Sequence, residues 1–500
     1  MTSFTSPLPA IGATLRISPM PKLAIALLLT GFADWLFYDQ RSGISVVVFA
    51  VALAAAALLA NMDQLAPRRA GSAGLVLLAA LLPAIEELNA LSLFFVVLAL
   101  AMSLALVTGR ELSRIKDRLA ALRDLYLIGP FRLIGDVISS LKVQSLTRGI
   151  ALWFVPVVFG GVFVLLFASA NPLIEQWVNL LNPGKLLETI DIWRALFWLG
   201  VLALVWPFVH VRWRRRKAKL AAAPAVPLDD AAAAEERNRE ILGAPEILRS
   251  LILFNLLFAV QTLLDLIYLW GHAGLPAGIT YAAYAHRGAY PLIATALLAA
   301  AFVLVAMRPK APAEQSPVIR SLVYVFVTQN VMLVVSSILR LHLYVEVYLL
   351  TYWRVAAFVW MLLVAIGLVL IVARIWFGHS NAWLVRKNVI TLIGTLYICS
   401  LTNFAAIIAD YDVAHSKEAG GKGASLDAVY LLGLGPQALP AINKAILNGV
   451  ADLGITSCLV RRRDQLVEMQ AQDMASWRSW GFRSYRLQLY LDRRARHVTD

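Results

Sequence analysis

The chain has 500 residues, of which 60% are hydrophobic and only 15% are charged, and its mean hydropathy is +0.71. Soluble domains are nearer half apolar and a quarter charged, so this composition excludes an ordinary soluble protein and indicates a membrane protein. The net charge of +14 would suit nucleic acid, but most Lys and Arg residues lie in particular connections between apolar runs. That distribution is typical of membrane topology, so we expect no nucleic acid among the partners of the chain.

Apolar runs long enough to cross the hydrocarbon core of a bilayer recur along most of the chain. They predict an all-α fold, a polytopic bundle of about eleven transmembrane spans followed by a small C-terminal helical extramembrane domain. The third run is short and precedes Pro83, Glu86 and Glu87, so it is also compatible with a re-entrant segment. The predicted spans are 22–38, 43–61, 70–84, 90–108, 149–170, 191–211, 248–270, 289–307, 317–339, 348–375 and 387–409.

Composition divides the chain into four parts. Residues 1–217 form an N-terminal half with six spans, and residues 241–409 form a second half with five. The low-complexity stretch 218–240 is typical of a cytoplasmic linker, and residues 410–500 are predicted to form the external helical domain. Within the first half, residues 110–147 alternate charged and apolar positions at helical spacing, which predicts amphipathic cytoplasmic helices.

Basic residues predict the orientation. They follow the second, fourth, sixth, eighth and tenth spans, as Arg68, Arg110, Arg212, Arg308 and Arg374 illustrate. Cytoplasmic loops carry the excess of Lys and Arg, so the N-terminus is expected in the cytoplasm and, with an odd number of spans, the C-terminus outside.

An unusual group of polar side chains lies between two apolar runs, in Leu339–Ala356. It includes Arg340, His342, Glu346 and Arg354. If a single helix begins near Leu343, then Tyr344, Tyr348 and Thr351 share one stripe, which Arg354 extends into the span. A charge at mid-membrane costs about 2.5–3.5 kcal/mol, so something must compensate for it.

Further polar residues are expected at the same depth. Asp265 lies within the seventh span, and the outer loop after that span holds Tyr284, His286 and Arg287. Together these residues predict an outward-facing cationic cavity, since guanidinium groups grip phosphate or carboxylate in a bidentate manner. The candidate ligand-binding residues are Asp265, Tyr284, His286, Arg287, Arg340, His342, Tyr344, Glu346, Tyr348, Thr351 and Arg354.

A purely structural interpretation competes with this one. Asp265 with Arg354, or Glu346 with Arg340, would then be an interhelical ion pair that fixes the bundle. The tyrosines would belong to the aromatic belt at the membrane interface.

Four local sequences resemble a known family. They are Gly31–Phe37, Gly278–Leu292, Leu339–Thr351 and Asp427–Pro440. They are similar to bacterial multi-span membrane proteins of the domain-of-unknown-function four-one-seven-three family, related to the four-one-five-three group. The third departs slightly, since this chain has Tyr348-Leu-Leu-Thr where the family often has Tyr-Gly-Leu-Thr. The resemblance implies a polytopic fold in the bacterial inner membrane and no particular mechanism.

Three functions remain open. The first is binding of an anionic lipid or a lipid-linked envelope glycan, with His286, His342 or Glu346 as a general base if the protein is a transferase. The others are a secondary transporter, and a membrane scaffold or sensor without catalysis. The chain contains no phosphate-binding loop, no HExxH or paired-cysteine metal motif and no GxSxG elbow, so neither a cofactor nor a metal is predicted.

Overall fold

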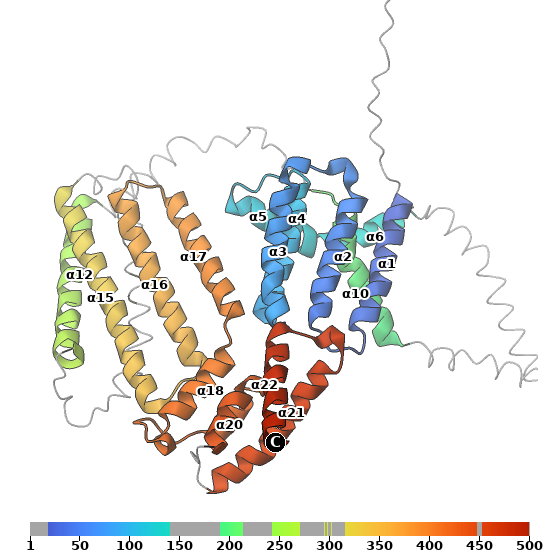
Figure 1. Ribbon diagram of the computed structural model, residues 1–500. Helices are drawn as coiled ribbons and strands as arrows, with labels where there is room; N and C mark the ends of the chain where they lie inside the picture. Colours follow the sequence, from blue (N-terminus) through green and yellow to red (C-terminus); the bar gives the residue numbers. More distant parts are fainter. Residues whose placement is uncertain are drawn as a thin grey trace, which may run out of the picture. The chain divides into compact units, whose positions relative to one another are not determined.

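The computed structural model describes residues 19–140, 191–213, 243–270, 295, 298, 302, 316–447 and 453–499 (Figure 1). Every regular element in these ranges is helical, which confirms the all-α prediction. The chain divides into two compact units. The first consists of Met1–Arg215 with Asp473–Tyr485, and the second of Arg216–Gln472 with Arg486–Asp500.

The first unit is a helical bundle. Its helices are α1 (Pro19–Phe37), α2 (Ile44–Ala60), α3 (Ala70–Glu86), α4 (Ala90–Val107), α5 (Ile115–Leu122), a π-helical turn (Arg123–Leu127), α6 (Gly129–Ser140) and α10 (Ile192–Val209). Helix α2 packs against α1, α3, α4 and α10. Their apolar faces form one buried core, to which Leu53, Leu104 and Phe208 belong.

The two ends of this bundle differ in charge. At one end the connection after α2 meets the ends of α4 and α10, since Asn61 Nδ2 donates to Phe208 O at 2.9 Å and Ala66 N donates to Val107 O at 2.7 Å. This end carries basic residues, among them Arg68, Arg69, Arg110 and Arg212. The opposite end holds the α1–α2 and α3–α4 connections and the start of α10, with Asp39, Glu86, Glu87 and Asp191.

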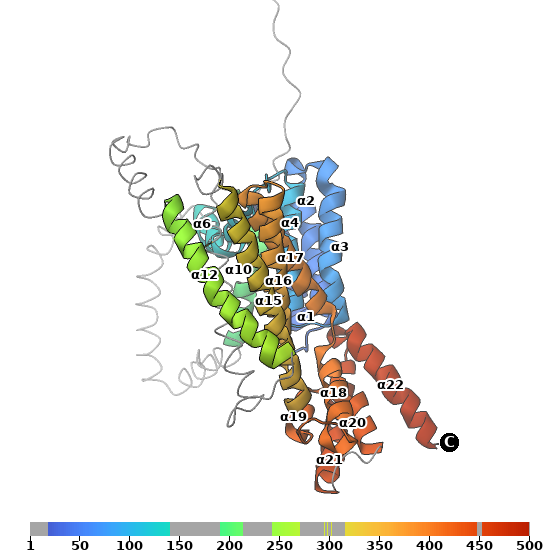
Figure 2. The same ribbon diagram turned by 90° about the vertical axis from the view of Figure 1, so that its left-hand side faces the viewer.

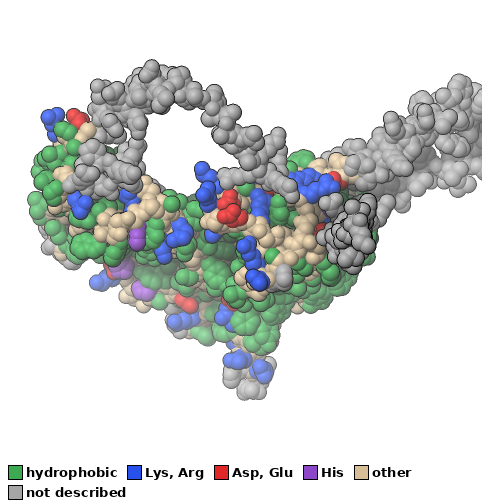
Figure 3. All heavy atoms as spheres, turned by 90° about the horizontal axis from the view of Figure 1, so that it is seen from above, with side chains coloured by type: hydrophobic (Ala, Val, Ile, Leu, Met, Phe, Trp, Pro, Cys, Tyr) green, Lys and Arg blue, Asp and Glu red, His purple; other side chains and the backbone are tan. Residues whose placement is uncertain are grey.

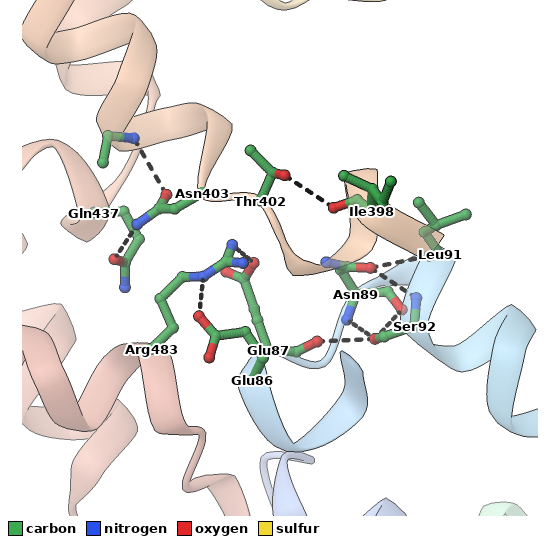
Figure 4. A network of polar contacts seen from close by, with 11 residues as sticks. Glu86, Glu87, Asn89, Leu91, Ser92, Ile398, Thr402, Asn403, Gln437 and Arg483 are labelled. Atoms are coloured by element: carbon green, nitrogen blue, oxygen red, sulfur yellow. Dashed lines mark hydrogen bonds and ion pairs between the residues drawn. The ribbon is translucent and has the colours of Figure 1, made fainter. Parts of the chain in front are cut away.

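The segment Asp473–Tyr485 packs onto the acidic end of the first unit. Ile44 N donates to Trp480 O at 2.8 Å, and the Arg478 guanidinium lies 4.6 Å from the centre of the Trp35 ring. Arg483 is 5% exposed and forms ion pairs with both Glu86 and Glu87 (Figure 4). The segment therefore supplies a cation to two carboxylates of the bundle.

The second unit contains the remaining helices. They are α12 (Ala244–Asp265, continued by a π-helical turn Leu266–Trp270), α15 (Pro317–Tyr348), α16 (Tyr352–Trp376), α17 (Asn381–Leu401), α18 (Phe404–His415), α19 (Ala428–Gly433), α20 (Leu439–Leu447), α21 (Leu453–Met474) and α22 (Phe482–Thr499). Helices α12, α15, α16 and α17 pack in chain order as a row. Residues 473–474 of α21 and 482–485 of α22 belong to the first unit.

The short helices form a second core at the end of α15 (Figure 2). Ile408, Leu431, Ile442 and Leu459 are almost completely buried there, together with Val345 from α15. Helix α19 and helix α20 are joined by a turn in which Gly435, before Pro436, has φ 82°.

Six of the described helices are long and apolar enough to cross a membrane, which indicates a membrane protein. They are α4, α10, α12 with its π-helical turn, α15, α16 and α17, while α2 and α3 are shorter apolar helices. The predicted span 149–170 and almost all of 289–307 lie outside the described residues. The total of about eleven spans therefore stays a prediction.

Two predicted boundaries are wrong. Helix α15 does not end near residue 339 but continues to Tyr348. The predicted span 387–409 is two helices, because α17 ends at Leu401 and Asn403 begins α18 by accepting a hydrogen bond from Ala406 N at 3.2 Å. The Asn403 amide also donates to Gln437 Oε1 at 3.0 Å, as Figure 4 shows, so the break is stabilised by a tertiary contact.

Candidate functional site

A polar pocket of about 460 Å³ lies in the second unit, where α15 ends and α16 begins. Helix α18 and the loop before α19 complete its wall. Its volume falls within the range of small-ligand sites. The lining residues are Tyr348, Leu349, Leu350, Thr351, Arg354, Asp412, Ala424, Ser425, Leu426, Asp427 and Tyr430.

The pocket exists because the chain leaves the helical path for three residues. Leu349 has φ 65°, a conformation that favours glycine. Two hydrogen bonds hold the break: Asp412 Oδ1 accepts from Leu350 N at 2.7 Å, and Val347 O accepts from Ala424 N at 2.7 Å. Thr351 then caps α16. The predicted single helix with Tyr344, Tyr348 and Thr351 on one stripe is therefore wrong.

Arg354 lies in the first turn of α16 and points back to the end of α15. Its Nη1 donates to Tyr348 O at 2.6 Å and to Leu349 O at 2.5 Å, and its Cζ lies 4.7 Å from the centre of the Tyr344 ring. These carbonyls end α15, where the helix dipole attracts a cation. Contrary to the prediction from the sequence, Arg354 therefore does not extend a stripe from α15 deep into the span. Among the described residues, none forms a hydrogen bond or ion pair with Nε or Nη2 of Arg354.

Three acceptor groups face the same pocket. Asp412 is only 4% exposed, and burial raises the pKa of its carboxyl to about 6. Its Oδ1 accepts from Leu350 N, and no described residue donates to its Oδ2. The Tyr430 hydroxyl accepts from Tyr352 N at 3.0 Å. Asp427 caps α19 by accepting from Tyr430 N at 2.9 Å and is exposed.

The loop before α19 is packed tightly over the break. A Cβ atom on Gly423 would lie 2.6 Å from His415 O and 2.7 Å from a methyl carbon of Leu349, so only glycine fits without movement. Glu418 Oε2 accepts from Leu426 N at 2.9 Å and ties the loop to itself. The wall of the pocket is therefore fixed by packing and hydrogen bonds on both sides.

The structure brings only some of the predicted site residues together. Tyr348, Thr351 and Arg354 line the pocket, and Tyr344 lies beneath the Arg354 guanidinium. Arg340 does not reach it: its guanidinium is buried between α12 and α15 in an ion pair with Asp265. An interhelical ion pair therefore exists, as the structural interpretation predicts. It joins Arg340 to Asp265, whereas the predicted pairs were Asp265 with Arg354 and Glu346 with Arg340.

The remaining predicted residues lie elsewhere. His342 and Glu346 approach each other to 3.4 Å with more than half of each side chain exposed, and neither lines the pocket. Tyr284, His286 and Arg287 lie outside the described residues. Sequence reasoning missed Asp412, Asp427 and Tyr430. The one signal for Asp412 is a carboxylate in the apolar stretch Phe404–His415.

A second cavity, of about 110 Å³, lies within the first unit and is almost entirely apolar. Small side chains of α2, α3 and α4 line it, with Phe208 from α10. It offers room for a hydrocarbon group but no groups for chemistry. In the described ranges, no set of three His, Cys, Asp or Glu side chains is arranged to hold a metal ion.

Comparison with known proteins identifies the family. The model of the Domain of unknown function (DUF4153) matches residues 22–445, a range that includes every residue of the polar pocket. No curated protein and no solved structure matches the chain. Because the family model covers most of the sequence, the resemblance seen in the local patterns is confirmed, and the chain belongs to the DUF4153 family.

Proposed function

We propose that this chain is an integral membrane protein that binds the phosphate-bearing headgroup of a membrane amphiphile, an anionic lipid or a lipid-linked glycan, in the pocket between α15 and α16. The observation that carries the proposal is the hydrogen bonding of the Arg354 guanidinium. Arg354 lines the polar pocket; its Nη1 is anchored by two carbonyls, whereas Nε and Nη2 have no hydrogen-bond or ion-pair partner among the described residues. Such a fixed guanidinium edge suits two phosphate oxygens.

The location of the pocket supports an amphiphile over a free solute. Helices α15 and α16 are 32 and 25 residues long, and both are apolar enough to cross a membrane. The pocket lies where these helices meet, and Trp353 beside it is 85% exposed, as is typical of the aromatic belt at a membrane interface. A headgroup at this level would leave its hydrocarbon chains beside the helices.

Arg354 is the one cation among the described residues that line the pocket, and two carboxyl groups lie in the same wall. A ligand with several negative charges would be repelled by Asp412 and Asp427. We therefore favour a headgroup with one phosphodiester.

Arg354→Gln is the first test of this function. The variant should lose amphiphile that copurifies with the wild-type protein, by about tenfold or more, because a charge-assisted bidentate contact contributes about 1.5–3 kcal/mol. Native mass spectrometry of the detergent-purified chain measures the retained ligand. Arg386→Gln is the matched control, since Arg386 is exposed on α17 and does not line the pocket. Equal retention by both variants and the wild type would refute the proposal.

We further propose that the protein lies in a bacterial inner membrane with the N-terminus in the cytoplasm and the C-terminus in the periplasm. In the first unit, the end with Arg68 and Arg110 lies opposite the end that binds Asp473–Tyr485. Figure 3 shows Lys and Arg side chains on the face seen from above the view of Figure 1. The positive-inside rule supports a cytoplasmic position for that end.

A C-terminal fusion tests the orientation. We expect alkaline phosphatase to be active when it is fused after Asp500, because this enzyme folds only where its disulfides form. Green fluorescent protein at the same position should then be dark. The opposite pair of results would place the C-terminus in the cytoplasm.

A further inference from the structure

We infer that the pocket selects a headgroup that carries a primary ammonium group in addition to its phosphate, as phosphoethanolamine does. This inference rests on the proposed function, because it assumes that a phosphate lies against Arg354, but it replaces the anionic lipid of that proposal by a zwitterionic one. It concerns Asp412, Asp427 and Tyr430, the acceptor groups of the pocket, which an anion cannot neutralise.

The charges in the wall are unequal. Arg354 is the one cation among the described lining residues, whereas Asp412 and Asp427 are both carboxylic acids. Asp412 is only 4% exposed. Of its two carboxylate oxygens, only Oδ1 accepts a hydrogen bond from a described residue, Leu350 N. A phosphate on Arg354 would bring a second negative charge close to a buried carboxylate, which costs free energy unless a cation lies between them.

Hydrogen-bonding capacity identifies the kind of cation. Asp412 Oδ2 and the second oxygen of Asp427 accept no hydrogen bond from a described residue, and the Tyr430 oxygen has a further lone pair beside them. These are acceptors on two adjoining elements. A primary ammonium offers three donors and one positive charge, so it satisfies the acceptors and balances the carboxylates.

Two other common headgroups meet only part of this requirement. A phosphocholine group has the same charges, but its trimethylammonium has no N–H donor. A phosphoglycerol group has hydroxyl donors, but it brings no positive charge to Asp412. Comparing the three headgroups therefore separates charge balance from hydrogen bonding.

The experiment measures dissociation constants of dihexanoyl phosphatidylethanolamine, phosphatidylcholine and phosphatidylglycerol for the detergent-purified full chain by native mass spectrometry. The ethanolamine lipid should bind about tenfold more tightly than each of the others, as expected for one additional charge-assisted contact. Asp412→Asn should reduce that preference to within about threefold. The amide oxygen of asparagine still accepts from Leu350 N, so the variant keeps the hydrogen bond that stabilises the break between α15 and α16. Asp427→Asn should act in the same direction, and Asp464→Asn, on an exposed side chain of α21, is the control.

Each outcome decides one claim. Tighter or equal binding of the glycerol or choline lipid to the wild-type protein would overturn the ammonium inference, and the proposed function would stand if Arg354→Gln weakened all three lipids. A preference for ethanolamine that survives both aspartate substitutions would show that the carboxylates do not recognise it. Binding of no lipid, or binding that Arg354→Gln leaves unchanged, would end the proposed function itself.

Discussion

Replacing Arg340 by methionine is expected to destabilise the folded protein by about 3–5 kcal/mol, because it leaves Asp265 as a buried charge without its cation. Arg340 and Asp265 are 4% and 2% exposed, and their ion pair joins two helices of membrane-spanning length. Water cannot enter easily to compensate for the loss. Asp265→Leu should be about as harmful, since it removes the carboxylate that pairs with the buried guanidinium of Arg340.

The double variant tests the reason for the effect. Arg340→Met with Asp265→Leu removes both charges, so it should recover most of the stability that either single change loses. Midpoints of thermal unfolding in detergent, followed by size-exclusion chromatography, give the comparison. Arg386→Met serves as the control because Arg386 is exposed. If the double variant were as unstable as the sum of the singles, the pair would not be an electrostatic unit.

Gly43→Ala is expected to release the segment Asp473–Tyr485 from the first unit. An added Cβ would lie 2.4 Å from the carbonyl carbon and oxygen of Ser479 and 2.7 Å from Trp480 O. These are backbone atoms, so no change of rotamer relieves the clash, and the hydrogen bond between Ile44 N and Trp480 O must break. The contacts of Arg478 with Trp35, and of Arg483 with Glu86 and Glu87, depend on the same docked position.

Limited proteolysis measures this release. Trypsin should cleave after Arg478 or Arg483 about tenfold faster in Gly43→Ala than in the wild type, because cleavage follows the population of the opened segment. Gly74→Ala is the matched control, since an added Cβ at Gly74 meets no atom within 4 Å. Equal cleavage rates in the two variants would show that the docked segment accommodates the added methyl group, and would contradict the prediction.

Much of the architecture was predictable because it depends on local properties of the chain. The length of an apolar run decides whether a helix reaches across a bilayer, and α4, α10, α12, α16 and the first part of α15 follow the predicted limits closely. Turn chemistry is equally local, as the Gly435-Pro436 turn shows. The group of polar residues around Arg354 was also visible as an exception to the apolar pattern.

The partners of those polar residues were decided by the tertiary structure. Arg340 and Arg354 look equivalent in the sequence, but one is buried against Asp265 of α12 while the other turns back to the end of α15. The reason is the break at Leu349, which depends on hydrogen bonds to Asp412 and Ala424, more than sixty residues away along the chain.

By itself, then, the sequence determined an all-α membrane protein of the DUF4153 family and the neighbourhood of its candidate site. Only the tertiary structure placed Asp412 and Tyr430 in the pocket wall and the segment Asp473–Tyr485 on the first unit. Helix formation in a bilayer depends on backbone hydrogen bonds within one segment, whereas ion pairs and pockets join residues whose separation along the chain carries no information about their distance in space.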